Sequence, residues 1–566
     1  MELYNYLLPK PREIVVLDEG AKRDFLNGKL GQQEYKILIK NAQPVIKGGS
    51  KAAIFYAKQT FVQLERLYGQ GKTPDLYIHD WPEIETRGYY YDITRGKVPT
   101  LKTLKLLVDR LAEYKINQLQ LYVEHTFAFE GFEEMWENAT PLTANEIKTL
   151  DDYCTKRHIE LVPSLSTFGH LYELLSTKKY RHLAELEDAG EWTFNWPDRM
   201  QHHTIDVSNP ESIKVIKNLL DQYIPLFKSD KFNICCDETF DLGRGKNAEL
   251  AKKLGKGRLY IDFLKQIIAH VKSHGKTAMF WGDILLEHPE YISEIPNDTI
   301  LLNWDYAPNP SEEKISKISE GGLTQYLCPG VWSWNNLVCD IKTGYENISK
   351  MTRFAVKYKA MGVLITDWGD FGNVNSLAAS IPGMIMGAAF SWNPDEITKF
   401  DQICKIISRT EYGDESEKLV SLMSTFCNLS ESNAMIWIGL VHLDYINIMG
   451  KNHIWHNDHL NSMNFDEVIK KVEDTNDNYE LICETIRNAQ RISPEDAEEI
   501  KVSIRGLEVL LKITAQKIDN KASIRYISKS ELKREKNIWL KDFSKTWLKR
   551  NKKSELFRIK EFVGRL

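Results

Sequence analysis

The sequence predicts an α/β protein whose central part is a (β/α)8 barrel. Eight short apolar stretches, each typical of a buried parallel strand, recur between residues 88 and 366. Amphipathic stretches typical of helices separate most of them, for example Leu101–Glu113 and Ile341–Ala360. Eight strands alternating with helices over roughly 300 residues are the count and length of this barrel. A doubly wound open sheet is the alternative, but no glycine-rich phosphate loop follows the first strand.

The predicted elements divide the chain into three parts. Residues 1–82 are expected to form a small α+β domain, with strands at 13–17, 34–39 and 74–78, a helix at 51–68 and a linker at 79–82. Residues 83–394 are expected to form the barrel, with strands near 88–93, 116–123, 158–165, 232–236, 277–281, 299–304, 324–329 and 362–366. Further helices are predicted there at 210–227 and 248–273. Residues 395–566 are expected to form a helical domain, from amphipathic stretches at 396–409, 416–427, 433–449, 465–488, 493–519 and 529–550.

Composition excludes several classes of protein. With 566 residues, 42% hydrophobic content and a net charge of −5, the chain is typical of soluble multidomain proteins. It has no basic stripe for nucleic acid, and no run of about 18 apolar residues for a membrane span. The start lacks a basic region followed by an apolar stretch, so a cytoplasmic location is expected unless a leader was removed. The eight Cys have no metal-ligand spacing and are expected to be reduced and buried, so no metal or cofactor is predicted.

Candidate functional residues follow the predicted strands, where such barrels place their chemistry. Asp237 and Glu238 come directly after the fourth strand. A lone Asp-Glu pair is usually just solvated, and a lone Trp is usually part of a core. Here, however, carboxylates and aromatic residues follow most of the predicted strands, and the pattern Trp-x-Asp occurs at two of them. This recurrence is harder to explain by core packing alone. The other candidates are Arg87, His170, Trp281, Trp304, Tyr306, Trp332, Trp334, Trp368 and Asp370.

Aromatic rings that alternate with carboxylates are typical of a sugar site. Flat rings cover the apolar face of a pyranose, carboxylates bind hydroxyls, and one carboxylic acid protonates the glycosidic oxygen. Two carboxylates on neighbouring residues leave one strand end together, so they do not straddle the anomeric carbon as an acid and a nucleophile would. The pattern therefore favours chemistry in which the substrate supplies the nucleophile.

These residues resemble glycoside hydrolase family 20, the β-N-acetylhexosaminidases. The resemblance covers about residues 34–390 and lies in Phe55–Thr60, Asp80-Trp81-Pro82, Arg87–Arg95, Pro163, Gly169-His170, Asp237-Glu238 and Trp368-x-Asp370. It implies exo-acting, retaining hydrolysis of terminal β-linked GlcNAc or GalNAc from an oligosaccharide or glycoconjugate. By the same resemblance Glu238 is the general acid, Asp237 orients the acetamido group, and an Arg of the opening strand, Arg87, binds sugar hydroxyls.

The sequence departs from the family pattern at several positions. Asn233-Ile234-Cys235-Cys236 replaces the usual His-x-Gly-Gly before the pair, and Asp370 stands where the family more often has Glu. The second strand ends in Tyr122-Val123-Glu124-His125 rather than in the usual acidic loop. No Tyr follows the seventh strand to orient the acetamido oxygen, and Tyr306, after the sixth, is a possible substitute.

Two other functions fit the same residues. One is a β-galactosidase-like barrel enzyme in which Asp283 or Asp370 is a separate nucleophile. The other is a barrel that binds carbohydrate without cleaving it. Activity on a substrate that lacks the 2-acetamido group would favour the first alternative.

Overall fold

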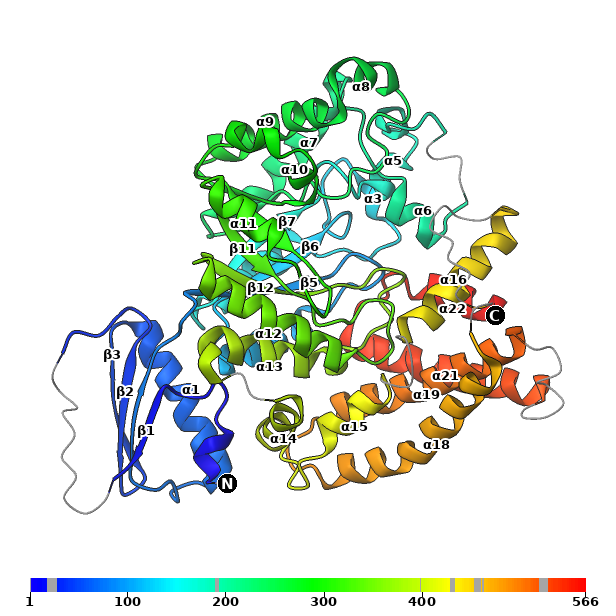
Figure 1. The fold of residues 1–566 in the computed structure, drawn as a ribbon. Coiled ribbons are helices and arrows are strands. Elements are labelled where there is room, and N and C mark those ends of the chain that lie inside the picture. The colour runs from blue at the N-terminus through cyan, green and yellow to red at the C-terminus, as the bar shows by residue number, and fades with distance from the viewer. Residues whose placement is uncertain are drawn as a thin grey trace.

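The computed structural model describes residues 2–17, 28–188, 193–396, 399–427, 433–451, 460, 463–518 and 528–566. A small sheet, a barrel and a group of helices follow one another along the chain (Figure 1). In that view the blue sheet and the yellow-to-red helices flank the barrel on its lower side. No helix among the described residues is long and apolar enough to cross a membrane.

The N-terminal sheet has four antiparallel strands in the order β1-β4-β2-β3. They are β1 (Glu13–Val16), β2 (Tyr35–Lys40), β3 (Gln43–Gly48) and β4 (Leu76–Asp80). Helix α1 (Lys51–Tyr68) buries its apolar face against the sheet, and the Ser50 side chain caps its first turn by accepting from Ala53 N–H. Strand β3 was not predicted, because it begins with Gln43 and Pro44 and none of its residues is fully buried.

The central strands close into a parallel barrel, as the sequence predicts. Their order around the barrel is β5, β6, β7, β8, β9, β10, β11 and β12, with β12 pairing back to β5. Their bounds are β5 (Thr86–Asp92), β6 (Gln118–Val123), β7 (Glu160–Leu165), β8 (Lys231–Asn233), β9 (Thr277–Trp281), β10 (Ile300–Trp304), β11 (Thr324–Cys328) and β12 (Gly362–Asp367). The fourth barrel strand is thus shorter than predicted, since its last two predicted residues, Cys235 and Cys236, adopt left-handed backbone conformations.

Alternate residues of the strands fill the barrel interior. This inner core is rich in aromatic rings and includes Tyr90, Tyr122, Trp281, Tyr326 and Trp368. The intervening residues pack outward against the helices in the main core. Cys235 lies inside the barrel and Cys236 outside it. Adjacent residues of a strand are expected to point to opposite faces in this way. The barrel interior is therefore a packed core rather than a channel.

Helices cover the outside of the barrel (Figure 1). The predicted helix at 248–273 is divided, because Gly255 has a φ of 86° and so interrupts it. The α-helices of the barrel part of the chain are α2 (Leu101–Glu113), α3 (Glu133–Trp136), α4 (Ala144–Thr155), α5 (Tyr172–Leu175), α6 (Trp196–Gln201), α7 (Pro210–Tyr223), α8 (Ala248–Leu254), α9 (Lys256–Ser273), α10 (Asp283–Glu287), α11 (Glu313–Glu320), α12 (Ile341–Lys357) and α13 (Leu377–Trp392).

The C-terminal helices pack on the barrel through α13, which is buried along its whole length. Helix α13 contacts β5 and β12 on one side and α19 on the other. The C-terminal helices are α14 (Phe400–Thr410), α15 (Leu419–Thr425), α16 (Asn433–Met449), α18 (Phe465–Asn488), α19 (Pro494–Ile518), α21 (Lys529–Arg550) and α22 (Leu556–Arg565). Helix α22 was not predicted, although it returns the chain to the barrel next to α6 and α16.

Candidate active site

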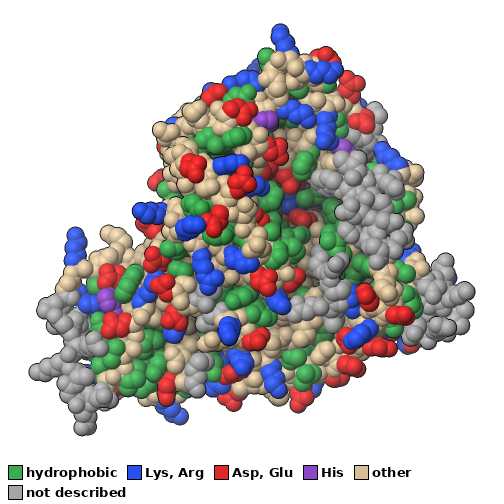
Figure 2. Space-filling view, viewed as in Figure 1, with side chains coloured by type: hydrophobic (Ala, Val, Ile, Leu, Met, Phe, Trp, Pro, Cys, Tyr) green, Lys and Arg blue, Asp and Glu red, His purple; other side chains and the backbone are tan. Residues whose placement is uncertain are grey.

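Eight of the predicted site residues line one cavity at the carboxyl ends of the strands. Its volume is about 180 Å³, and Figure 2 shows a hollow near the middle of this face, with acidic, basic and hydrophobic side chains around it. The eight are Asp237, Glu238, Trp281, Trp304, Tyr306, Trp334, Trp368 and Asp370. Arg95 and Met200 complete the lining and were not among the candidates. The cavity therefore combines aromatic walls with three carboxylates and one guanidinium.

The Asp237–Glu238 pair lies on an unusual backbone. Cys235, Cys236 and Glu238 have φ values of 57°, 65° and 48°, in the left-handed region that non-glycine residues rarely adopt. Outliers of this kind cluster at functional sites, where the surrounding structure holds them in place. Here the Tyr260 hydroxyl donates to Cys236 O at 2.9 Å, and the Glu238 N–H donates to Asp283 Oδ2 at 3.0 Å.

His170 lies behind the pair and touches both carboxylates. Its Nε2 is 3.4 Å from Asp237 Oδ2 and 3.3 Å from Glu238 Oε2. Burial disfavours charge on this imidazole, but the two carboxylates outweigh it and raise the pKa of His170 to about 10. The three residues have the ligand types of a metal site. A protonated imidazole offers no lone pair, however, so the group is better described as an ion-paired triad.

His203 fixes the orientation of His170. The rings stack with centroids 4.3 Å apart, and His203 Nδ1 accepts from the His170 backbone N–H at 2.7 Å. His203 Nε2 faces Met200 O at 2.8 Å, so it carries the proton. Burial and the neighbouring charge of His170 hold the pKa of His203 well below its ordinary value. A neutral ring therefore supports a cationic one beneath the two carboxylates.

Asp283 is a third buried carboxyl group beside the pair. Burial and the charges of Asp237 and Glu238 raise its pKa well above the ordinary value. Asp283 is therefore harder to ionise than an ordinary aspartate.

The aromatic walls hold polar groups that lack partners within the protein. Trp368 Nε1 donates to the Tyr306 hydroxyl at 2.7 Å, and the same hydroxyl also interacts with the Thr366 side chain. Among the described residues, Trp281 Nε1 and Asp237 Oδ1 are buried without a hydrogen-bond partner. Trp332 lies just outside the lining: its Nε1 donates to Tyr306 O at 2.8 Å, and its ring packs 4.8 Å from that of Trp334. Unpaired buried groups of this kind are uncommon in folded proteins, and a catalytic role is one of their explanations.

Arg95 and Asp370 form the polar side of the cavity. Arg95 Nη1 donates to Asp370 Oδ1 at 2.9 Å, and the guanidinium is held between the rings of Tyr122 and Trp368, 5.1 and 4.9 Å from their centroids. Glu124 lies 3.5 Å from Arg95 Nε. Burial raises the pKa of Asp370 to about 6, against the opposing effect of Arg95. A guanidinium paired with a carboxylate is a suitable anchor for adjacent hydroxyl groups.

The assignment of Arg87 to the substrate site is wrong. Arg87 is the second residue of β5 and is therefore at the opposite end of the barrel from the cavity. Its guanidinium donates to the carbonyls of Ile84, Glu85 and Lys115 and packs 4.9 Å from the Trp392 ring. Trp392 belongs to the core of the N-terminal sheet, so Arg87 joins that sheet to the barrel. The arginine beyond the end of the same strand, Arg95, occupies the site instead.

A second cavity, of about 450 Å³, adjoins the first. Glu238 and Trp304 line both. The remaining walls come from the loop after β8 and from α9, α10 and α11, and they include the basic side chains of Arg244, Lys256, Lys314 and Lys317. Glu238 therefore stands between a small aromatic cavity and a larger, more polar one.

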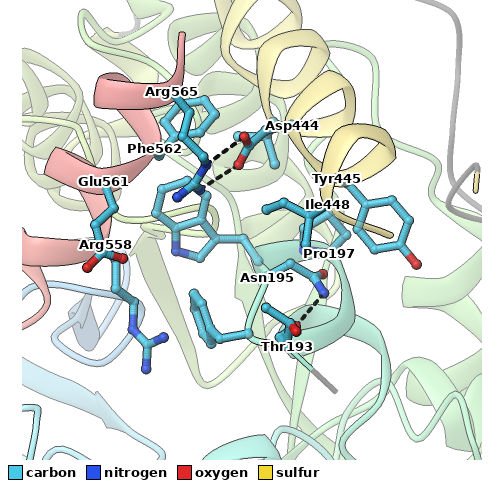
Figure 3. A pocket seen from close by; sticks show the side chains of 13 residues that line it. Thr193, Asn195, Pro197, Asp444, Tyr445, Ile448, Arg558, Glu561, Phe562 and Arg565 are labelled. Atoms are coloured by element: carbon cyan, nitrogen blue, oxygen red, sulfur yellow. Dashed lines mark hydrogen bonds and ion pairs between the residues drawn. The ribbon is translucent and has the colours of Figure 1, made fainter. Parts of the chain in front are cut away.

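A third cavity, of about 310 Å³, lies on the far side of α6 (Figure 3). The beginning of α6, at Trp196 and Pro197, lines this cavity, whereas Met200 near its end lines the candidate site. Across it, Arg565 of α22 forms two hydrogen bonds to Asp444 of α16, at 2.8 and 2.6 Å. Helix α6 thus separates the candidate site from the C-terminal helices.

Fold and site together define a class: a (β/α)8 barrel with adjacent carboxylates in an aromatic cavity at its catalytic face. Residues 85–333 match the model of the glycosyl hydrolase family 20 catalytic domain. Residues 85–333 are therefore identified as a divergent catalytic domain of glycoside hydrolase family 20. It is 24% identical to hexosaminidase D of Bos taurus over 38% of this chain and 60% of that protein. It is 26% identical to the β-hexosaminidase β subunit of Felis catus over 68% of this chain and 73% of that protein.

Solved structures show the same fold. A Flavobacterium johnsoniae chitobiase matches with a TM-score of 0.60 and 18% identity, over 95% of this chain and 96% of that one. A family 20 exo-β-N-acetylglucosaminidase from Vibrio harveyi, in complex with N-acetylglucosamine, matches with a TM-score of 0.58 and 18% identity, over 74% and 78% of the two chains. The likeness to the chitobiase extends over nearly the whole chain, including the part outside the family-model match.

Proposed function

We propose that the protein is an exo-acting, retaining β-N-acetylhexosaminidase that removes terminal β-linked GlcNAc or GalNAc from oligosaccharides or glycoconjugates. The observation that carries this proposal is the position of Asp237 and Glu238. One imidazole, that of His170, contacts both carboxylates, at 3.4 and 3.3 Å, so both lie on the same side of the cavity. An enzyme that uses its own carboxylate as nucleophile needs that group on the opposite side of the anomeric carbon from the acid. A substrate-assisted reaction does not, because the 2-acetamido oxygen of the sugar attacks the anomeric carbon instead.

Each carboxylate has a distinct role in this reaction. Glu238 is partly exposed, with 29% of its side chain accessible, and it faces both cavities, so it protonates the leaving glycosidic oxygen and later activates water. Asp237 is more buried, with 10% accessible, and its free Oδ1 accepts the acetamido N–H. Its negative charge stabilises the positive oxazolinium-like intermediate.

The acetamido oxygen is oriented by Tyr306. Tyr306 lines the aromatic cavity and its oxygen accepts from Trp368 Nε1, so the phenolic proton is the group that this hydroxyl offers to a substrate carbonyl. The indoles of Trp281 and Trp368 pack against each other, with ring centroids 5.7 Å apart, and form an apolar wall of the cavity for the methyl group. Asp237 and Tyr306 thus hold the amide from its two ends and align its oxygen for attack.

The size of the two cavities supports cleavage from a chain end. At about 180 Å³ the aromatic cavity is small for a ligand pocket, since ordinary pockets hold ~300–1,000 Å³. It suits one sugar residue, held at its hydroxyls by Arg95 and Asp370. The leaving group is on the Glu238 side, where the 450 Å³ cavity accommodates it.

Hydrolysis of a panel of aryl β-glycosides tests this function. Purified protein should cleave the β-GlcNAc or β-GalNAc glycoside and leave the β-Gal and β-Glc glycosides intact, because the last two lack the 2-acetamido nucleophile. Activity on the β-Gal glycoside would favour the enzyme with a separate nucleophile. Cleavage of none of them would favour a carbohydrate-binding barrel.

A further inference from the structure

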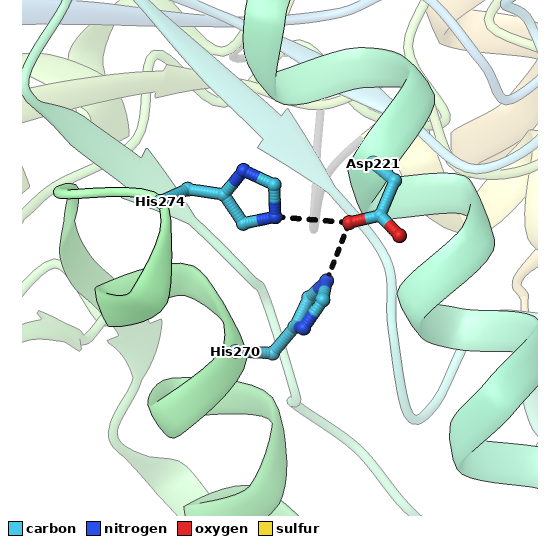
Figure 4. Close-up of side chains that lie close together, drawn as sticks. All are labelled: Asp221, His270 and His274. Atoms are coloured by element: carbon cyan, nitrogen blue, oxygen red, sulfur yellow. Dashed lines mark hydrogen bonds and ion pairs between the residues drawn. The ribbon is translucent and has the colours of Figure 1, made fainter.

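Three metal-ligating side chains converge outside the candidate active site. Asp221 is near the end of α7, while His270 is in the last turn of α9 and His274 caps that helix. His270 and His274 are four residues apart, so they lie on the same face of the helix. Figure 4 shows both rings directed at the Asp221 carboxylate from the neighbouring helix.

One carboxylate oxygen serves both rings. Asp221 Oδ1 is 2.7 Å from His270 Nε2 and 2.9 Å from His274 Nε2. A tetrahedral Zn²⁺ with bonds of about 2.0–2.2 Å separates its ligand atoms by about 3.3 Å. Each of the two contacts would therefore lengthen by about half an ångström to admit the ion. The Asp221 side chain is 52% accessible and so has room to make this movement.

Two similar groups of side chains are already committed to other partners. Among the described residues, His170 with Asp237 and Glu238, and His125 with Glu173 and Glu555, also bring three ligand atoms within 4.8 Å. The first is the candidate catalytic triad, and in the second Arg199 Nη1 donates to Glu555 at 2.7 Å. Within the described residues, the ion pairs of Asp221 are those with the two histidines.

We propose that Asp221, His270 and His274 bind a divalent transition-metal ion, with Zn²⁺ as the reference case and water as the fourth ligand. Two imidazole nitrogens and one carboxylate oxygen suit Zn²⁺, Ni²⁺ or Cu²⁺ rather than Mg²⁺ or Ca²⁺. The Nε2 atoms bind the ion, while the Nδ1 atoms keep their protons.

The position of the cluster assigns the ion a structural role. His274 precedes β9, which begins at Thr277, so the cluster lies at the amino end of the strands, opposite Asp237 and Glu238. The ion would join α7 to α9 on the outer layer of the barrel. It is therefore expected to stabilise the fold and to leave the glycosidase activity unchanged.

Calorimetric titration of chelator-treated protein with Zn²⁺ tests the proposal. Wild type should bind one Zn²⁺ per chain in the micromolar range, and its Tm should rise by about 2 °C or more at saturation, because an ion that binds only the folded state stabilises it. His270→Ala and His274→Ala should abolish both effects. Asp221→Asn, which keeps an acceptor oxygen but loses the charge, should weaken binding more than about tenfold.

His182→Ala is the matched control, because His182 is an exposed histidine whose ion pair among the described residues is with Glu211, at 2.9 Å. It should bind Zn²⁺ as wild type does. Zn²⁺ binding that survives in both His270→Ala and His274→Ala overturns the proposal, as does the absence of saturable binding up to millimolar Zn²⁺. Tm and stoichiometry are measured without substrate, so neither result depends on the proposed enzymatic function.

Discussion

Glu555, which precedes α22, accepts a 2.7 Å hydrogen bond from Arg199 Nη1 of α6. It also lies 3.0 Å from His125 Nε2, at the end of β6. Burial would raise the pKa of Glu555, but Arg199 and its cationic neighbours outweigh burial and hold this pKa well below the ordinary value. Arg199 is followed by Met200, which lines the candidate active site. The C-terminal part of the chain thus contributes Glu555 to the residues that hold this wall of the cavity in place.

Glu555→Gln should destabilise the protein and weaken substrate binding. It removes the hydrogen-bonded carboxylate of the buried Arg199, which keeps only the longer contacts to Glu173 at 3.8 Å and Glu124 at 4.0 Å. Breaking a buried ion pair typically costs about 3–5 kcal/mol, and the two remaining carboxylates should place the loss at or below the lower end of that range. Because the folded-state pKa is lowered, the stabilisation by Glu555 is complete above the ordinary Glu pKa of about 4.3 and is lost as the pH falls through the folded value. Thermal unfolding and KM at neutral pH measure both effects.

Glu498→Gln, which removes a partly exposed carboxylate paired with Lys549, is the control and should change neither the Tm nor the KM. Equal Tm values for the two variants would contradict the role of Glu555.

Arg95→Met should impair substrate binding, whereas Arg87→Met should impair thermal stability. Arg95 faces the cavity, so its loss should raise KM by a factor corresponding to roughly 1.5–3 kcal/mol, the value of a charge-assisted hydrogen bond. Arg87 joins the sheet to the barrel, so its loss should lower Tm and leave the KM of the folded fraction unchanged. Kinetics and thermal unfolding of both variants check this. A raised KM in Arg87→Met alone would restore the original assignment.

The KM of the wild type should rise as the pH falls below about 6. Asp370 has a pKa of about 6, so below that pH it takes up a proton and loses the charge that attracts sugar hydroxyls and Arg95. Asp370→Asn should have a high KM that does not change across this range. The pH dependence of kcat is measured in parallel, so that effects on binding and on turnover are separated. The same KM dependence in Asp370→Asn would assign the titration to another group.

Glu238→Gln should lose roughly 10²–10⁴-fold in rate on substrates with poor leaving groups. The loss should shrink as the leaving group improves, because a good leaving group needs less protonation. A series of aryl glycosides of graded phenol acidity measures this trend. An equal loss across the series is incompatible with Glu238 as the general acid.

The barrel was predictable because parallel strands buried on both faces leave continuous apolar runs, and because loop signals separate those runs. The strand-end rule located most of the cavity, and applied strictly it would also have chosen Arg95, which follows β5, over Arg87, which is its second residue. No such rule could locate Met200, which lies on a short helix between strands. The contribution of Glu555 was equally hidden, since only the tertiary fold brings it to His125.

The central claim is that Asp237 stabilises an intermediate formed by the acetamido group of the substrate. The measurement that tests it most directly is inhibition by a thiazoline mimic of that intermediate, compared between wild type and Asp237→Asn. The variant keeps the shape and hydrogen-bonding capacity of the side chain but removes its charge, which is expected to cost on the order of 10²–10³ in rate and little in ground-state binding. The account predicts strong inhibition of the wild type and weak inhibition of the variant. Equal inhibition of both, or a wild type that ignores the mimic, would contradict it.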